Sequence, residues 1–259
     1  MQGVLKEVVA RRELLGILVL RNIKIRYKES VLGFLWTMMG PVFMILIYAF
    51  FLRLMKFQMG IPVLVSGIFV WQYLAMCLGD SPHAIIGSSN LVKKASFPRI
   101  LLPLSTAFAN FVNFLLSMVI VVVFVRFYGC HFGPVGLLPL AILTHVALCV
   151  GVSLILSALN VFFRDVQHIV GLLGMAWFFL TPVIYDVSLL GQFTTNPVLL
   201  RAFFANPMTG VICLYRGALL DAPLPDPASI ALSVGVAWLV FVVGVAMFQR
   251  LQWRFADEM

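Results

Sequence analysis

Long apolar runs without Asp, Glu, Lys or Arg alternate with short polar stretches along this 259-residue chain. A helix that crosses the hydrocarbon core of a bilayer, which is roughly 30 Å thick, needs about 20 mostly apolar residues. Because backbone groups in lipid must pair within their own segment, such runs predict helices. The pattern predicts six spans, at residues 31–52, 57–79, 100–125, 137–160, 166–185 and 228–249.

The composition indicates the same fold class. Hydrophobic residues make up 62% of the chain and charged residues only 11%, whereas a soluble domain is about 25% charged. This balance excludes an ordinary cytosolic enzyme, a disordered chain and a disulfide-stapled secreted domain. The predicted fold is an all-α membrane protein with a six-helix transmembrane domain over residues 31–254.

The distribution of positive charge predicts the orientation of the spans. Six spans place both termini on one side, and most of the 18 Lys and Arg residues lie in segments on that side. Cytoplasmic loops of membrane proteins are enriched in Lys and Arg, so both termini, including a short tail at residues 255–259, are predicted to be cytoplasmic. The net charge of +8 then reflects topology and attraction to anionic lipids, and it does not indicate nucleic-acid binding.

The N-terminal segment, residues 1–30, is predicted not to span. It carries apolar residues at helical spacing and a basic stripe formed by Arg21, Lys24 and Lys28. This pattern is typical of an amphipathic helix that lies in the headgroup plane. A plain lipid anchor is the alternative interpretation.

The outer loop at residues 186–227 is also predicted not to span, because proline interrupts it repeatedly. Residues 209–220 within it have a helical apolar pattern, but a helix of that length reaches only about 18 Å. A re-entrant or interfacial helix is expected, and an ordinary amphipathic loop helix is the alternative. Arg216 in this segment is expected to snorkel or to pair with Asp186 or Asp221.

Catalytic and metal-binding motifs are missing from the sequence. It contains no HExxH, GxSxG, CxxC or acidic metal motif, and no GxxxxGK loop for nucleotide phosphates. The chain is therefore predicted not to be an enzyme and to hold no metal or cofactor. His145, inside an apolar run, is expected to be a neutral histidine bonded to a neighbouring carbonyl, and Asp80 either couples with His83 or marks a solvated helix end.

Aromatic residues make up 13% of the chain. For most of them an aromatic belt at the lipid interface is the simplest interpretation. Trp177, Phe178 and Phe179 lie deeper in their predicted span, and there they either line a path for sugars or face lipid. Pro41 and Pro182 are expected to kink the first and fifth spans.

Four stretches in register carry a family resemblance. They are RNIKIRYKESVLGFLW at residues 21–36, NLVKKASFPR at 90–99, FRDV at 163–166 with TPVIY at 181–185, and NPMT at 206–209 with YR at 215–216. Together these stretches resemble the permeases of polysaccharide-exporting ABC transporters of the type-2 class. The resemblance covers nearly the whole chain.

This resemblance implies a homodimeric permease that works with two copies of an ATP-binding subunit, which holds ATP and Mg. The implied substrate is a lipid-linked polysaccharide of the O-antigen, capsule or teichoic acid type, moved across the bacterial inner membrane. The first and fifth spans would line the channel at the dimer axis, and the loop at residues 90–99 would couple to the ATPase.

Four groups of candidate site residues follow. The ATPase-coupling candidates are Asn90, Leu91, Lys93, Lys94, Phe97, Pro98 and Arg99. The inner-mouth candidates for a phosphate or a headgroup are Arg21, Lys24, Arg26 and Lys28. The channel-lining candidates are Tyr27, Trp36, Trp177, Phe178 and Tyr185, and the outer-gate candidates are Asn206, Pro207, Tyr215 and Arg216.

Three rival functions remain open. A permease of the same fold could export a drug or a small lipid, because the sequence does not give the width of the channel. A membrane-embedded transferase acting on a polyprenyl carrier would need several acidic residues at a membrane face, and the chain has only isolated ones. A structural membrane protein would not need the kinked first span.

Overall fold

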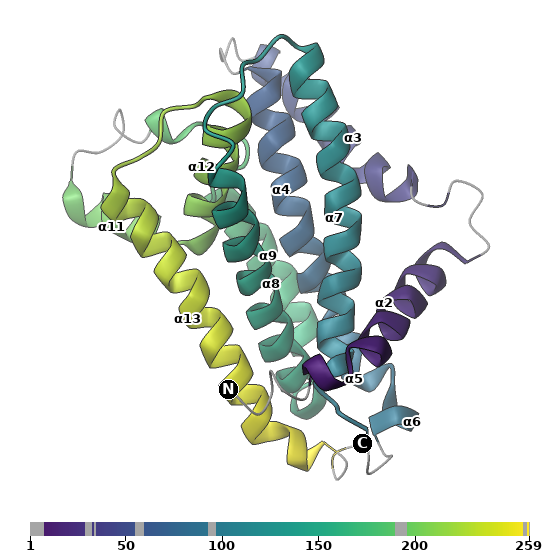
Figure 1. The fold of residues 1–259 in the computed structure, drawn as a ribbon. Coiled ribbons are helices and arrows are strands. Elements are labelled where there is room, and N and C mark those ends of the chain that lie inside the picture. Colours follow the sequence, from purple (N-terminus) through teal and green to yellow (C-terminus); the bar gives the residue numbers. More distant parts are fainter. Residues whose placement is uncertain are drawn as a thin grey trace.

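The computed structural model describes residues 8–28, 33, 35–54, 60–92, 97–189, 196–255 and 258, and every regular element among them is a helix (Figure 1). The α-helices are α2 (Arg12–Tyr27), α3 (Leu35–Leu54), α4 (Ile61–Asp80), α5 (His83–Ile86), α6 (Ser89–Val92), α7 (Leu101–Phe127), α8 (Leu137–Phe162), α9 (Val166–Leu180), α11 (Pro197–Phe204), α12 (Pro207–Leu220) and α13 (Pro227–Leu251). Two 3₁₀ turns, η1 (Val187–Leu189) and η2 (Gln252–Arg254), complete the described elements.

Four of these helices, α4, α7, α8 and α13, are long and apolar enough to cross a bilayer. The predicted spans 57–79, 100–125, 137–160 and 228–249 coincide with them closely. The predicted spans 31–52 and 166–185 correspond to α3 and α9, which are shorter apolar helices. The fold is therefore an all-helical membrane protein. Its lower end, as drawn in Figure 1, carries α5, α6 and η2.

The prediction for the fifth span was wrong at its C-terminal end, because α9 stops at Leu180 and not at Tyr185. Proline disfavours the helical conformation of the residue before it, and Thr181, before Pro182, is extended with φ −106° and ψ 142°. The Thr181 hydroxyl donates to the carbonyl of Trp177 at 2.7 Å. The side chain thus satisfies a carbonyl at the broken helix end.

The segment between α9 and α13 contains a helical pair, α11 and α12, bent by 78° at the break between them. The two helices start in the same way, since Asn196 and Asn206 accept from the backbone N–H two residues later, and a proline follows each. Proline is well suited to the first helical position because its missing N–H has no partner there. Every residue of α12 from Pro207 to Leu219 is buried, which places this short helix inside the bundle.

Helices α8 and α13 approach closely through glycine. A Cβ on Gly151 would lie 2.6 Å from the Cα of Phe241, and a Cβ on Gly244 would clash with the backbone of Gly151. Small residues let membrane helices approach until their backbones touch. Gly151 and Gly244 therefore form the point of closest approach between α8 and α13.

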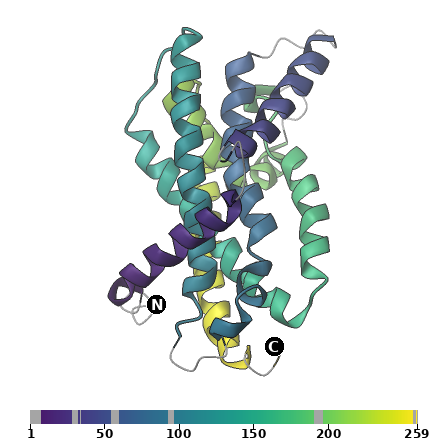
Figure 2. The same cartoon turned by 90° about the vertical axis from the view of Figure 1, so that its right-hand side faces the viewer.

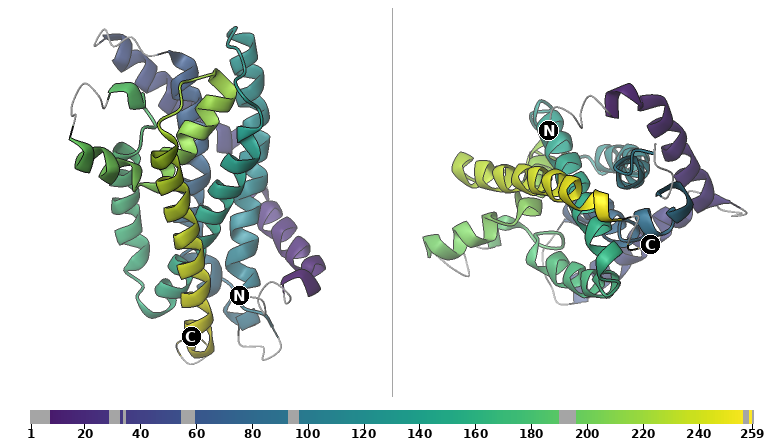
Figure 3. Two further views of the ribbon diagram at one scale, coloured as in Figure 1. Left: turned by 60° about the vertical axis from the view of Figure 1, so that its left-hand side comes forward. Right: turned by 90° about the horizontal axis from the view of Figure 1, so that it is seen from below.

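Helix α2 lies along the lower part of α7 (Figure 2). Seen from below, α2 runs along one flank of the bundle, while α11 projects from the opposite flank (Figure 3). Leu18 is the buried residue of α2, whereas Ile17, Leu20 and Ile25 are exposed. These exposed apolar side chains share the outer side of α2 with the exposed Lys24, and a mixture of apolar and basic side chains suits the headgroup plane of a membrane.

Two glycines of α13 should respond to alanine in opposite ways. Gly244→Ala forces a methyl group against Gly151, and overpacking of this kind costs about 1–3 kcal/mol. Gly235→Ala has no heavy atom within 4 Å of its new Cβ and should be neutral or stabilising by about 0.5–1 kcal/mol, because alanine favours a helix. Thermal unfolding in detergent micelles measures both. An equal melting temperature for the two variants would show that the α8–α13 contact does not limit stability.

Candidate functional site

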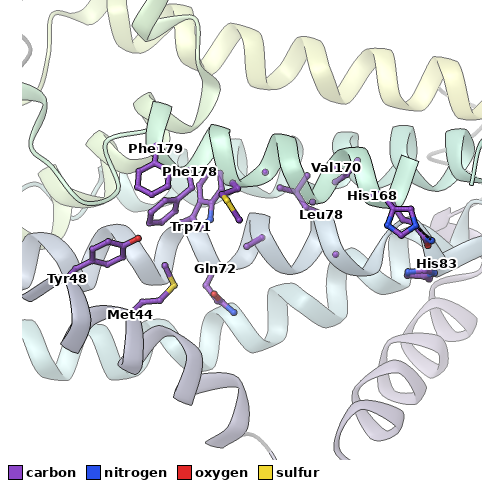
Figure 4. Close-up of a pocket in the computed structure, with 16 residues that line it drawn as sticks. Met44, Tyr48, Trp71, Gln72, Leu78, His83, His168, Val170, Phe178 and Phe179 are labelled. Atoms are coloured by element: carbon purple, nitrogen blue, oxygen red, sulfur yellow. Dashed lines mark hydrogen bonds between the residues drawn. The ribbon is translucent and has the colours of Figure 1, made fainter. Parts of the chain in front are cut away.

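A groove of about 740 Å³ runs between α3, α4 and α9. Figure 4 shows its two ends: Tyr48, Trp71, Phe178 and Phe179 gather at one end, and His83 and His168 lie at the other. Leu78 and Val170 lie between the two ends. The groove thus has an aromatic upper part and a lower part that carries hydrogen-bonding side chains.

The aromatic end is a packed cluster. Phe178 lies 5.6 Å from Trp71 in an edge-to-face contact, 6.1 Å from Tyr48 in a stacked one and 5.2 Å from Phe179, between ring centroids. These distances suit aromatic pairs, which favour edge-to-face and offset arrangements. Phe178 is the one buried residue of α9, so this contact positions α9 against α4.

The lower end of the groove is polar. Gln167 and His168 lie side by side on α9, with their side-chain nitrogens 3.2 Å apart. His83 faces them from the start of α5 (Figure 4). These groups both donate and accept hydrogen bonds, and therefore suit hydroxyl or phosphate oxygens equally well.

The other channel-lining candidates lie outside this groove. Trp177 donates from Nε1 to the Oδ1 of Asn206 at 2.8 Å, and it borders a separate apolar pocket beside α11. The Tyr185 hydroxyl donates to the carbonyl of Phe179 at 3.3 Å. Trp36 is exposed on α3, and Tyr27 donates to the Oδ1 of Asn113 at 2.8 Å. Of the five candidates, only Phe178 lines the groove.

Asn206, one of the outer-gate candidates, joins three elements. Its Oδ1 accepts from Trp177 on α9, and its Nδ2 donates to the Thr181 hydroxyl at 2.8 Å. Its own carbonyl, and that of Phe204, accept from the Ser233 hydroxyl on α13. Asn206, directly before Pro207, therefore ties the α11–α12 bend to the end of α9 and to the last span.

Arg216 on α12 is buried, and it neither snorkels nor pairs with Asp186 or Asp221. Its guanidinium donates to the carbonyls of Tyr185 and Val183 at 2.9 Å and of Val63 at 3.1 Å. The sequence expectation of an acidic partner was therefore wrong. Backbone carbonyls freed by the end of α9, and one in the first turn of α4, supply its acceptors instead.

A buried aromatic cluster surrounds His145 on α8. The rings of Tyr73, Phe114 and Tyr215 lie 4.8, 5.2 and 5.9 Å from it between centroids. Among the described residues, neither ring nitrogen of His145 has a hydrogen-bond partner, so the expected bond to a carbonyl is absent. Aromatic rings from α4, α7 and α12 occupy the space around the imidazole.

The coupling candidates that the structure describes lie at the lower end, between α4 and α7. Leu91 is half-buried on α6, Phe97 is half-buried against the core, and Pro98 is buried. Arg99 donates from its guanidinium to the carbonyl of Gln252 in η2. Asn90 belongs to α6, but its side chain, like Lys93 and Lys94, lies outside the described residues.

Sequence analysis missed the contact that docks α2. Arg26 pairs with the carboxylate of Asp80 at 2.5 Å and donates to the Oδ1 of Asn110 at 2.7 Å. The Nδ2 of Asn110 in turn donates to Asp80 at 2.9 Å. Asp80 is an acid directly after an apolar run, and such residues are retained for a partner or a function. This rule predicts a basic partner for Asp80, although it does not indicate that the partner lies 54 positions away.

The remaining inner-mouth candidates fall on two faces of α2. Lys24 and Lys28 are exposed, whereas Arg21 is half-buried beside Ser88. The predicted basic stripe is thus divided, since Arg21 and Arg26 contact the bundle through Ser88, Asp80 and Asn110.

The similarity of this chain to known proteins extends over nearly its whole length. A family model described as ABC-2 type transporter matches residues 13–220. The chain is 31% identical to an O-antigen export system permease protein RfbA of Klebsiella pneumoniae, over 95% of this chain and 94% of that protein. It is also 31% identical to the protein of the same name in Myxococcus xanthus, over 98% of each chain.

The Arg26–Asp80 pair should show energetic coupling. In a double-mutant cycle with Arg26→Gln and Asp80→Asn, the double variant should be more stable than the sum of the single losses predicts, by about 0.5–3 kcal/mol. Each single variant leaves a partly buried charge without its partner, and the double variant does not. Thermal unfolding of the four proteins measures the coupling, and strict additivity would mean that the pair does not dock α2.

Arg216→Lys should destabilise the protein although the charge is kept. An ammonium group lacks the planar fork of the guanidinium and should leave at least one of the three carbonyls unpaired, at a cost of about 1–3 kcal/mol. Arg201→Lys, at an exposed position on α11, is the matched control and should be neutral. A melting temperature of Arg216→Lys equal to that of the control would contradict this role.

Proposed function

Because the chain belongs to the ABC-2 type transporter family, we propose that it is the transmembrane permease subunit that exports a lipid-linked polysaccharide. An O-antigen is the substrate class that the names of its relatives indicate. The observation that carries this proposal is similarity to O-antigen export permeases over nearly the whole of both chains. The route runs across the bacterial inner membrane, with both termini in the cytoplasm.

The groove between α3, α4 and α9 suits such a substrate. Sugar rings have flat apolar faces and a hydroxyl rim, and the aromatic upper part offers surfaces on which those faces can stack. The polar lower part, with His83, Gln167 and His168, offers donors and acceptors for hydroxyl groups. The groove therefore forms part of the proposed path.

A second copy of the chain would complete this path. The groove is open along α3 and α9, and both helices expose large apolar side chains there and beside it, including Phe43, Leu46, Phe50, Leu172 and Met175. Two copies related by a twofold axis would face these helices toward each other and enclose the path. The proposed assembly is a homodimer with two ATP-binding subunits.

The partner subunit would supply the energy. Conformational change needs a ligand that binds two states with different affinity, and this sequence lacks the GxxxxGK loop that holds nucleotide phosphates. Family membership implies an ATP-binding partner. The segment from α5 to Arg99, at the lower end beside η2, is the proposed docking surface.

The test is deletion of the gene in its host, followed by analysis of surface polysaccharide and of extracted lipid-linked glycans. Loss of the surface polymer, with the lipid-linked form accumulating in the cell, is the expected result. A tagged chain should also co-purify in mild detergent with an ATP-binding subunit. Normal surface polysaccharide together with retention of a drug or a small lipid would instead favour a different cargo for the same fold.

A bulky side chain in the groove should block export. Ala75→Trp adds an indole to the wall of the groove and should lower surface polymer at least tenfold while the ATP-binding subunit still co-purifies. Gly235→Trp, at an open position on α13, is the matched control and should export normally. Unchanged export with Ala75→Trp would place the polymer path elsewhere.

A further inference from the structure

A second pocket, of about 370 Å³, lies at the lower end where α2 meets α5 and α7. Figure 2 shows α2 crossing this part of the bundle. The polar residues that line the pocket are Arg21, Asn22, Arg26, Asp80, His83, Ser88 and Thr106. Polar side chains thus make up more than half of its lining, and two of them are arginines.

The positive charge in this pocket exceeds the negative charge. Asp80 is the one acidic residue in its lining, and its carboxylate is already paired with Arg26 and bonded by Asn110. Arg21 has no acidic partner among the described residues, and it donates only long hydrogen bonds of 3.4 Å to Asn22 and Ser88. One guanidinium charge in the pocket is left without a counter-ion.

The hydrogen-bond donors of both arginines are incompletely used. The Nε of Arg21 and the Nη1 of Arg26 are buried and have no partner among the described residues. Buried donors without an acceptor destabilise a structure, so a ligand with several acceptor oxygens would be favoured if small rotations of the two side chains turned these groups toward it. Phosphate oxygens meet this need, because guanidinium groups bind them through paired hydrogen bonds.

We propose that this pocket binds the phosphate or diphosphate group of a lipid at the membrane surface, with Arg21 as the principal ligand and Ser88, Asn22 and His83 as neighbouring polar groups. The source of that group is either the headgroup of an anionic phospholipid or the diphosphate end of a lipid-linked substrate. Lys24 and Lys28 do not line the pocket.

The position of His83 relates this pocket to the main groove. His83 lines both cavities, so an anion held by Arg21 lies next to the polar lower end of the groove. A lipid anchored here by its phosphate would present its attached glycan to the groove. This last step rests on the proposed function, whereas the anion site itself does not.

The experiment uses the permease purified with its ATP-binding subunit and placed in nanodiscs of neutral phosphatidylcholine. Binding of inorganic diphosphate is measured by ³¹P NMR line broadening, and the wild-type complex should bind. Arg21→Gln should weaken binding at least tenfold, and Arg21→Lys should restore part of it. Arg12→Gln, which removes the same charge from an exposed position on α2, should bind as the wild type does.

A second set of nanodiscs, which contain phosphatidylglycerol, distinguishes the two sources. Competition with diphosphate in these discs assigns the pocket to phospholipid headgroups, and unchanged binding assigns it to a diphosphate-bearing lipid. Because export is not measured, this assay and the gene deletion can fail independently of each other. Co-purification of the ATP-binding subunit with Arg21→Gln checks that this variant is folded.

Three results would overturn the proposal. The first is no diphosphate binding by the wild-type complex in neutral discs. The second is equal binding by Arg21→Gln and Arg12→Gln. The third is a loss with Lys24→Gln that Arg21→Gln does not produce, which would assign the anion to the exposed face of α2.

Discussion

The structure depends on satisfying the backbone where helices end inside a membrane protein. Lipid offers no water to an open carbonyl, so each broken helix must find donors within the protein. Arg216 meets this constraint for the carbonyls of Val183 and Tyr185 after α9, and it also donates to the carbonyl of Val63 in the first turn of α4. Gly67 makes the arrangement possible, because a Cβ at this position would collide with the carbonyl of Val183. The end of the short apolar helix α9, the buried helix α12 and the first turn of a span are thereby joined through one side chain.

The groove is a consequence of this arrangement. Pro182 ends α9, and Arg216 holds the segment after it against α4. The aromatic end of α9 is thereby placed beside Trp71, with which Phe178 is in edge-to-face contact. Asn206 holds the same end of α9 from the side of the α11–α12 bend, through Trp177 and Thr181. Trp71 and Trp177 are in edge-to-face contact and yet have different tasks, since Trp71 lines the groove and Trp177 supports the bend.

The parts of the fold that follow from local pattern were predictable from the sequence. Apolar runs located the long helices, and an apolar segment too short to span located α12. Contacts between residues distant in sequence were not predictable in the same way. Arg26 and Asp80 are 54 positions apart and Arg216 and Val63 are 153 apart, and no periodicity relates such pairs. A carboxylate partner was predicted for Arg216 because opposite charges attract, whereas its acceptors after α9 are the backbone carbonyls of Val183 and Tyr185. The end of α9 was predictable in principle, because Thr181 precedes a proline. The apolar run continues beyond Thr181, and for this reason the span was predicted to extend to Tyr185.

Burial divides the helices into those held firmly and those free to move. Nearly every residue of α12 is buried, and α4 and α8 are buried along much of their length, so movement of these helices would expose many packed side chains. Helix α9 buries only Phe178, and the described part of α3 buries only Met38 and Pro41. Elements with few buried contacts open at low free energy. Within one copy of the chain, we therefore expect the groove to widen by displacement of α3 and α9 from a stationary centre, and in the proposed dimer these two helices would move at the interface between the copies. Helix α12 carries the outer-gate candidates Pro207, Tyr215 and Arg216, and yet this argument assigns it to the stationary centre. Its displacement would break the three hydrogen bonds of Arg216 and would unpack the buried side chains of the whole helix.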